Sequence, residues 1–97
     1  MLAELTGMQL YCRQIAELEA DGQLASTVAG LAKMNNTRKA RWILSEARDL
    51  LGGNGILLDR HVIRHMADIE SVHTFEGTET VQTLIVGREI TGHSAFT

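Results

Sequence analysis

Proline is absent from this 97-residue chain, and aromatic side chains make up only 4% of it. Without proline, long helices can run uninterrupted. With so few aromatic rings, any core must be filled by aliphatic side chains and methionine. Cys12 is the one cysteine, which excludes an internal disulfide and a multi-thiolate metal site and fits a reducing compartment.

A membrane span, a secretory signal and a basic surface are also missing. No apolar stretch approaches the roughly 20 residues that cross a bilayer. The segment Met1–Leu5 has neither the basic start nor the apolar run of a secretory signal. The net charge of −3 argues against a nucleic-acid binder, which is normally basic. We therefore expect no membrane insertion and no nucleic-acid partner.

The residues that are present favour a small helical domain. Hydrophobic residues make up 44% of the chain, which is typical of a folded protein, and they recur at intervals of three and four. We expect one domain over residues 1–97, all-α, folded as an antiparallel bundle of about four helices. The expected helices cover about Leu2–Ala20, Ser26–Leu51, Asp59–Ile69 and Thr78–Gly92.

The apolar pattern also predicts which side chains face the core. Cys12 lies on the apolar stripe of the first helix and is expected to be buried. Ser26 and Asp59 are expected to cap the second and third helices. The other expected core positions are Leu5, Met8, Ile15, Val28, Leu31, Ala40, Ile43, Leu44, Ala47, Leu50, Leu51, Val62, Ile63, Met66, Val81, Leu84, Ile85 and Ile90.

Two clusters in the middle of the chain allow more than one interpretation. Lys33, Arg38, Lys39 and Arg41 gather in the second helix, either as a solvated face or as a contact for an anion or partner. Three of the four residues in Gly52–Gly55 are glycine. They end the second helix and form either a simple turn or a place where backbone amides approach a polar ligand.

His61 and His65 are four residues apart, as in zinc-binding helices. The residues between them include Arg64, which repels a cation, and lack the glutamate that a zinc hydrolase uses as its base. We therefore expect no metal site.

The segment Phe75–Thr78 places a carboxylate at a break between two helices. Thr78 is expected to cap the last helix, and Glu79 adds negative charge to its first turn. Glu76 then lies outside the helix and is either a solvated acid near a helix N-terminus or a group that meets a substrate. The spacing alone leaves both possibilities open.

Four segments in this order resemble the C-terminal helical domain of acyl-CoA dehydrogenases: Ala47–Ile56, His61–His65, Phe75–Thr78 and Leu84–Gly92. The resemblance covers nearly the whole chain. It is closest to the glutaryl-CoA dehydrogenase branch, because Asp49 stands before the glycine loop where most relatives have glutamine.

The resemblance implies a role for several residues. Glu76 matches the base that removes the α-proton of an acyl-CoA thioester before a hydride passes to FAD, and its amide would bind the thioester oxygen. Gly77 would line the acyl-CoA site. The residues that match contacts to FAD, often that of a neighbouring subunit, are Asp49, Leu50, Leu51, Gly52, Gly53, Thr78 and Phe96. In the glutaryl branch, decarboxylation follows oxidation.

The resemblance also implies partners and marks two departures. Relatives act on acyl-CoA, pass electrons to an electron-transfer flavoprotein and form homo-oligomers, in the bacterial cytoplasm or the mitochondrial matrix. Phe75 stands where the family usually has tyrosine. The chain also lacks the family's N-terminal helical and central β-domains, so we expect it to bind no FAD and to be inactive alone. A non-catalytic helical association module is the alternative.

Overall fold

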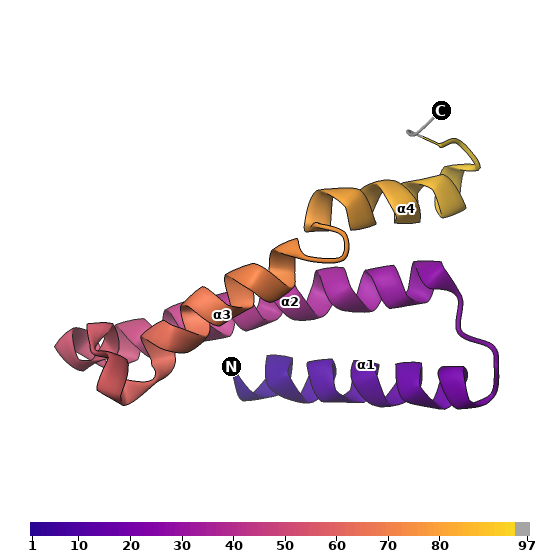
Figure 1. Cartoon of the computed structure of the whole chain (residues 1–97). Coiled ribbons are helices and arrows are strands. Elements are labelled where there is room, and N and C mark those ends of the chain that lie inside the picture. The colour runs from indigo at the N-terminus through magenta and orange to yellow at the C-terminus, as the bar shows by residue number, and fades with distance from the viewer. Residues whose placement is uncertain (95–97) are drawn as a thin grey trace.

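The computed structural model describes residues 1–94, and every regular element in that range is a helix. The expectation of an all-α chain with about four helices is confirmed (Figure 1). In chain order the elements are α1 (Leu2–Ala20), α2 (Ser26–Leu50), the short 3₁₀ helices η1 (Gly52–Ile56) and η2 (Leu58–Arg60), α3 (Val62–Thr74) and α4 (Glu79–Thr91). Phe96 lies outside the described residues.

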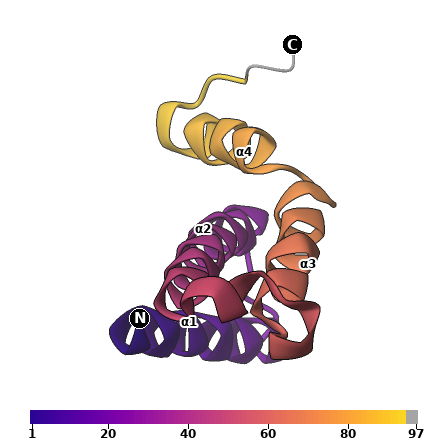
Figure 2. The same ribbon diagram turned by 90° about the vertical axis from the view of Figure 1, so that its left-hand side faces the viewer.

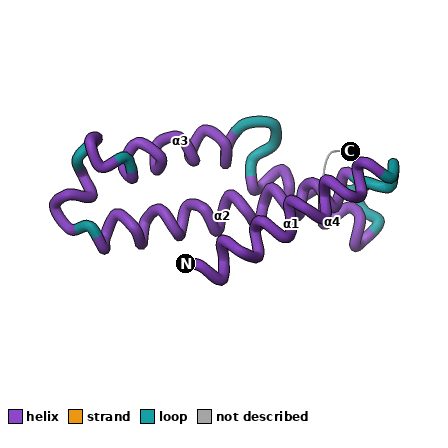
Figure 3. Tube along the Cα trace, turned by 90° about the horizontal axis from the view of Figure 1, so that it is seen from below, coloured by secondary structure: helices purple, strands orange, loops and turns teal. Residues whose placement is uncertain are grey.

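The long helix α2 is the centre of the molecule, and α1, α3 and α4 all pack against it. Each of these three runs in the direction opposite to α2, with α1 on one side and α3 and α4 following each other along the rest of its length (Figures 1 and 2). The molecule is consequently elongated, with extents of 48 × 31 × 18 Å. Figure 3 shows the α1–α2 and α2–α3 connections at the two ends of α2, with the turn between α3 and α4 lying part-way along it.

The core is thin for a chain of this composition. Among the described residues, the buried hydrophobic side chains are Ala32 and Val86, and no large side chain is fully enclosed. Three helices around one leave part of every apolar stripe uncovered. The exposed large hydrophobic residues are Met1, Leu2, Leu5, Leu10, Trp42, Leu50, Leu51, Ile56, Leu57, Leu58, Val72, Phe75, Leu84 and Ile90.

The expectation that Cys12 is a core residue is wrong, because its side chain is exposed. The helix α1 contacts only α2 closely, so its apolar stripe is covered from one side. Asn36 Nδ2 donates to the Cys12 Sγ over 3.2 Å. Five more residues expected in the core are exposed: Leu5, Leu50, Leu51, Leu84 and Ile90. Leu50, Leu51 and Ile90 stand at helix ends, and Leu5 and Leu84 lie on α1 and α4, each of which packs mainly against α2.

Two expected helix caps are also wrong. The N-cap of α2 is Ala25 rather than Ser26, and no side chain caps that end. Asp59 lies within η2, and α3 begins later, at Val62. The chain enters α3 through His61, whose φ of 70° turns the backbone sharply enough to end η2 and start a new helix.

The glycine-rich segment ends α2 as the sequence predicted. Gly52 adopts a φ of 60°, which glycine reaches without steric cost. Gly55 is buried against α2, and a side chain there would overlap the Arg48 carbonyl. The turn therefore depends on glycine for a close approach within the chain itself.

Candidate active site

The turn between α3 and α4 has an unusual backbone. Glu76 adopts a φ of 52° and Gly77 a φ of 101°, so two consecutive residues have a positive φ. Glycine reaches this region freely, but a residue with a Cβ does so at a cost. The turn ends at Thr78, whose Oγ1 accepts a hydrogen bond from the Val81 N–H over 3.2 Å. The predicted cap of the last helix is therefore confirmed, and Glu76 lies outside both helices.

The Lys33 side chain of α2 binds the backbone of this turn. Its Nζ donates to the backbone carbonyls of Phe75 and Gly77, the residues on either side of Glu76. The same ammonium lies 5.5 Å from the centre of the Phe75 ring, within range of a cation–π contact. One side chain therefore fixes both ends of the Glu76 peptide segment to α2.

The Gln82 side chain of α4 also binds the backbone of the turn. Its Nε2 lies 3.4 Å from the Glu76 carbonyl oxygen and 3.5 Å from that of Gly77. The side chain is buried between two glycines. A Cβ on Gly30 would come within 2.6 Å of its Oε1, and a Cβ on Gly77 would come within 2.6 Å of its Nε2. In its observed conformation the amide therefore occupies space that a side chain at either glycine would fill.

Glu76 itself is exposed and lines a groove of about 470 Å³. The groove lies between α2, the end of α3 and α4, and its other lining residues are Ser26, Ala29, Gly30, Lys33, Val72, Phe75, Gln82 and Ile85. A carboxylate on the edge of a largely apolar groove is placed to accept a proton from a molecule bound there. No hydrogen bond within residues 1–94 occupies the Glu76 N–H, which leaves it free to donate.

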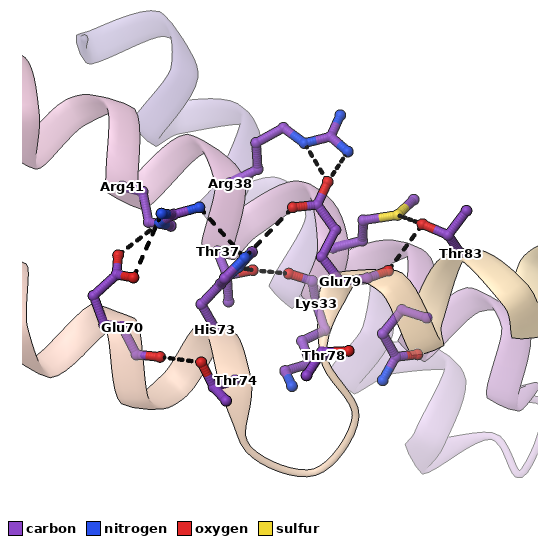
Figure 4. Close-up of polar contacts among 12 residues, drawn as sticks. Lys33, Thr37, Arg38, Arg41, Glu70, His73, Thr74, Thr78, Glu79 and Thr83 are labelled. Carbon is purple, nitrogen blue, oxygen red and sulfur yellow. Dashed lines mark hydrogen bonds and ion pairs between the residues drawn. The ribbon is translucent and has the colours of Figure 1, made fainter.

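A network of ion pairs surrounds the start of α4 (Figure 4). Arg38 donates two hydrogen bonds to a Glu79 oxygen, and Arg41 pairs with Glu70 of α3 over 2.7 Å. The hydrogen bonds from Arg38, helped by its charge and by those of His73 and Arg41, lower the pKa of Glu79, while partial burial acts in the opposite direction. The network ties α3 and α4 to α2 beside the turn.

His73 lies at the centre of this network. Thr37 Oγ1 donates its hydrogen to the Lys33 carbonyl over 2.8 Å, so toward His73 Nδ1, 3.0 Å away, it acts as an acceptor. The His73 Nδ1 therefore carries a hydrogen. The other ring nitrogen faces Glu79 Oε2 at 3.5 Å and Arg41 Nη1 at 3.4 Å. Neutral His73 accepts from Arg41, and protonated His73 donates to Glu79.

The basic cluster on α2 is therefore paired, with Arg38 and Arg41 exposed and Lys33 and Lys39 half-buried. Lys33, Arg38 and Arg41 reach the turn, α4 and α3 respectively, and Lys39 pairs with Glu4 of α1 over 3.2 Å. A solvated face was one of the two interpretations of these residues. The structure adds a role that the sequence did not indicate, namely the attachment of the outer helices to α2.

The residues matched to FAD contacts form two separate groups. Asp49–Gly53 lie where α2 passes into η1, whereas Thr78 caps α4. The 13-residue α3 lies between the two groups, and a helix of that length spans about 20 Å. Phe96 lies outside the described residues. Within one chain, Glu76, Gly77 and Thr78 come together, and Asp49–Gly53 do not join them.

Both groups have the chemistry to contact a flavin nucleotide from one side. Leu50 and Leu51 are exposed, and at Gly52 and Gly53 nothing lies within 4 Å of where a Cβ would stand. This combination gives an accessible apolar surface next to accessible backbone. The Thr78 hydroxyl accepts from Val81 and keeps its own hydrogen to donate. Neither surface encloses a ligand, so each would supply part of a site completed by other protein.

Neither a metal site nor a membrane span is found in the part of the chain that the structure describes. Residues 1–94 hold no group of three or more His, Cys, Asp or Glu side chains that could bind a metal ion. His61 is the N-cap of α3, and its Nδ1 lies 2.5 Å from Arg64 Nη2. Within the same range no helix has the length and apolar character needed to cross a membrane.

The chain is similar to known proteins over nearly its whole length. The family described as "Acyl-CoA dehydrogenase, C-terminal domain" matches residues 1–91. The cyclohex-1-ene-1-carbonyl-CoA dehydrogenase of Geobacter metallireducens is 28% identical over 93% of this chain and 24% of that protein. The (2S)-methylsuccinyl-CoA dehydrogenase of Cereibacter sphaeroides is 30% identical over 71% of this chain and 13% of that protein.

Two crystal structures of glutaryl-CoA dehydrogenase from Mycobacterium smegmatis share the fold, each with a TM-score of 0.87. One is 40% identical over 91% of this chain and 23% of its own length. The other, a complex with FADH2, is 33% identical over 99% of this chain and 27% of its own. The chain thus spans about a quarter, or less, of the proteins that it matches. It belongs to the acyl-CoA dehydrogenase family, to whose C-terminal domain residues 1–91 correspond.

Proposed function

We propose that this chain supplies the catalytic base of an FAD-dependent acyl-CoA dehydrogenase, and that the base is Glu76. The observation that carries the proposal is the position of this carboxylate, exposed on a left-handed turn at the edge of an apolar groove. The substrate would be an acyl-CoA thioester, and the neighbouring glutaryl-CoA dehydrogenase structures favour a glutaryl-type acyl group, for which decarboxylation follows oxidation.

The proposed chemistry begins with proton abstraction. Glu76 takes the α-proton of the thioester, and negative charge develops on the thioester oxygen. The Glu76 N–H, which no other group within residues 1–94 occupies, can donate to that oxygen. Enclosure of the groove by further protein would desolvate the carboxylate and make it a stronger base.

FAD, when bound, accepts the hydride that leaves the β-carbon. The Thr78 hydroxyl supports binding on the Glu76 side by offering a hydrogen-bond donor. Asp49–Gly53 lie at the other end of α3 and would contact a second flavin, that of a neighbouring subunit. Gly77 would line the acyl-CoA site next to Glu76. Electrons would then pass to an electron-transfer flavoprotein.

The test uses a hybrid enzyme, in which this chain replaces the matching C-terminal segment of the M. smegmatis glutaryl-CoA dehydrogenase. We expect the hybrid to oxidise acyl-CoA and the Glu76→Gln variant to lose at least about a thousandfold in kcat while still binding flavin. Glu89→Gln on α4 is the matched control and should leave kcat unchanged. Acyl-CoA oxidation that persists in Glu76→Gln would refute the role of Glu76.

The 97-residue chain alone gives a second, simpler measurement. Neither flavin surface encloses a ligand, so we expect the purified chain to show no flavin absorbance in its visible spectrum and no dehydrogenase activity. A stoichiometric yellow protein would contradict this expectation.

A second function is favoured by one observation, the many large hydrophobic side chains left exposed. Such surfaces mark sites of association. The chain alone would then be a helical association module, and it would cover these side chains in a homo-oligomer without catalysing a reaction.

A further inference from the structure

We propose that Lys33 and Gln82 are positioning residues for Glu76, a two-sided clamp that fixes the direction of the carboxylate by binding the backbone of its turn. The proposal rests on the proposed role of Glu76 as a base. It adds to that role the device that keeps an exposed side chain in one orientation.

The turn needs such a device because it is not stable by itself. A residue with a Cβ at a φ of 52° lies in a region that is disfavoured relative to right-handed backbone. Glu76 is also exposed, so neighbouring side chains do not hold it in place. An unsupported turn would relax to negative φ at Glu76, and that change would swing the carboxylate away from its present direction.

Lys33 opposes this relaxation through the carbonyls on either side of Glu76. Its ammonium binds the oxygens of Phe75 and Gly77 together, which is possible only while the peptide units between them keep the observed turn. Hydrogen bonds from a charged donor are stronger than neutral ones, and Lys33 is anchored on α2, the most extensively packed helix. A rotation at Glu76 would break at least one of the two bonds.

Gln82 opposes the same relaxation from α4. Its amide is buried between Gly30 and Gly77 and reaches the carbonyls of Glu76 and Gly77. Each of the three carbonyls from Phe75 to Gly77 therefore accepts from at least one of the two side chains: Phe75 from Lys33, Glu76 from Gln82, and Gly77 from both. Among residues 1–94, this arrangement leaves the Glu76 N–H and carboxylate without a hydrogen-bond partner, which a clamp for a base requires.

The first experiment measures the turn itself in the 97-residue chain, with a protease that cleaves after glutamate. Cleavage between Glu76 and Gly77 needs an extended backbone, so its rate reports how often the turn opens. We expect Lys33→Met to raise this rate about tenfold, equivalent to about 1.4 kcal/mol. Gln82→Met, which keeps the bulk but removes the donor, should raise it in the same direction.

The controls separate loosening of the turn from loss of stability. Lys39→Met lies on the same helix and loses only the contact with Glu4 of α1, so it should not change cleavage at Glu76. Cleavage after Glu19, in the last turn of α1, and the melting temperature report global unfolding in every variant. Lys33→Arg keeps several donors and should restore slow cleavage at Glu76. Equal rates in Lys33→Met and Lys39→Met would overturn the clamp.

The second experiment measures the consequence for the reaction in the hybrid enzyme. Misdirection of a base lowers kcat and leaves substrate binding intact, so we expect Lys33→Met to lose about tenfold in kcat with KM unchanged, and Lys33→Arg to recover most of it. A loss of kcat/KM that comes from a higher KM alone, with kcat unchanged, would overturn the positioning role. If Glu76→Gln keeps its activity while Lys33→Met still frees the turn for cleavage, the proposed base is wrong and the clamp is not.

Discussion

Glu76 combines a chemical role with a backbone conformation that its side chain disfavours. Its φ of 52° is one of two positive values among the described non-glycine residues. Strained backbone of this kind persists only where surrounding contacts impose it, and it gathers at functional sites. The contacts in this case are the bonds from Lys33 and Gln82. The strain is therefore consistent with the proposed base being held where its carboxylate is useful rather than where its backbone is most stable.

Glycine at position 76 should relieve the strain. We expect Glu76→Gly to be more stable than Glu76→Ala by about 1 kcal/mol, because glycine alone reaches positive φ without a clash, although it also gains freedom in the unfolded chain. Urea unfolding followed by circular dichroism measures the difference. The same pair of residues compared at Gly7, an open position within α1, is the control and should show the reverse order, with alanine more stable. The same order of stability for glycine and alanine at both sites would contradict the strain at Glu76.

The sequence predicted the place of Glu76 but not what holds it. The glycine and threonine that follow Glu76 indicated a break and a cap, and both lie there. Lys33, however, lies 42 residues from Phe75 in the chain, and nothing local in the sequence distinguishes it from its basic neighbours. A contact of that separation depends on how α2 and α3 pack, which spacing within one helix does not encode.

At the scale of elements, α3 and α4 are held to α2 by charge as well as by apolar contact. Glu79 begins α4, and its carboxylate meets Arg38 and His73 from the two neighbouring helices. Its side chain is 27% exposed, so water screens these pairs only in part. The contribution to stability therefore depends on the charge of Glu79.

The pH dependence of stability follows from the lowered pKa of Glu79. A carboxyl whose pKa is lower in the folded than in the unfolded chain binds protons more weakly when folded, so it stabilises the fold above its unfolded pKa. This stabilisation is lost as the pH falls from about 4.5, the ordinary value, through the lowered pKa of the folded protein. We expect Glu79→Gln to be less stable than the parent at pH 6 and to differ little from it at pH 2.5.

Urea midpoints measured from pH 6 to pH 2.5 test this expectation. Arg38, Arg41 and His73 face Glu79, and the two arginine side chains keep their positive charge over the whole range. Glu17→Gln is the control, because Glu17 pairs with Arg13 on the outer face of α1 and both side chains are more than half exposed. A gap between Glu79→Gln and the parent that stays constant with pH would contradict the assignment.

The order and type of the elements were predictable from the sequence, and some of their ends were not. The 3.6-residue periodicity of Leu2–Ala20 and the glycines after Leu51 predicted the first two helices to within one residue. Asp59 was a reasonable cap by residue type, yet η2 uses that position and His61 starts α3 instead. Short-range preferences give way at this point to the tight path between α2 and α3 that Gly55 allows by lying against Arg48.

At the scale of the whole molecule, the fold leaves more apolar surface exposed than an isolated domain usually shows. Five of the exposed large hydrophobic residues lie where α2 passes into η1 and η2, namely Leu50, Leu51, Ile56, Leu57 and Leu58. Figure 1 shows that this junction forms one end of the elongated molecule. Leu50 is 74% exposed and Leu58 is 68% exposed. Leu50 was predicted to be buried because every apolar position in the helix stripe was assigned to the core. In the proposed contact with a neighbouring subunit, Leu50 would be buried between two molecules rather than within one.

Association of the 97-residue chain is therefore the expectation at this scale. We expect sedimentation velocity to show a dimer or larger species whose fraction rises with concentration, since burial of each large apolar side chain contributes about 1.5–3 kcal/mol. The double variant Leu50→Gln, Leu58→Gln should weaken association at least about tenfold. Ile90→Gln removes an equally exposed side chain at the end of α4 and should leave association unchanged. A dimer of even micromolar affinity would form at about 100 times the protein concentration used for spectroscopy. A parent chain that stays monomeric at that concentration would show that a second copy of the chain does not bind this surface.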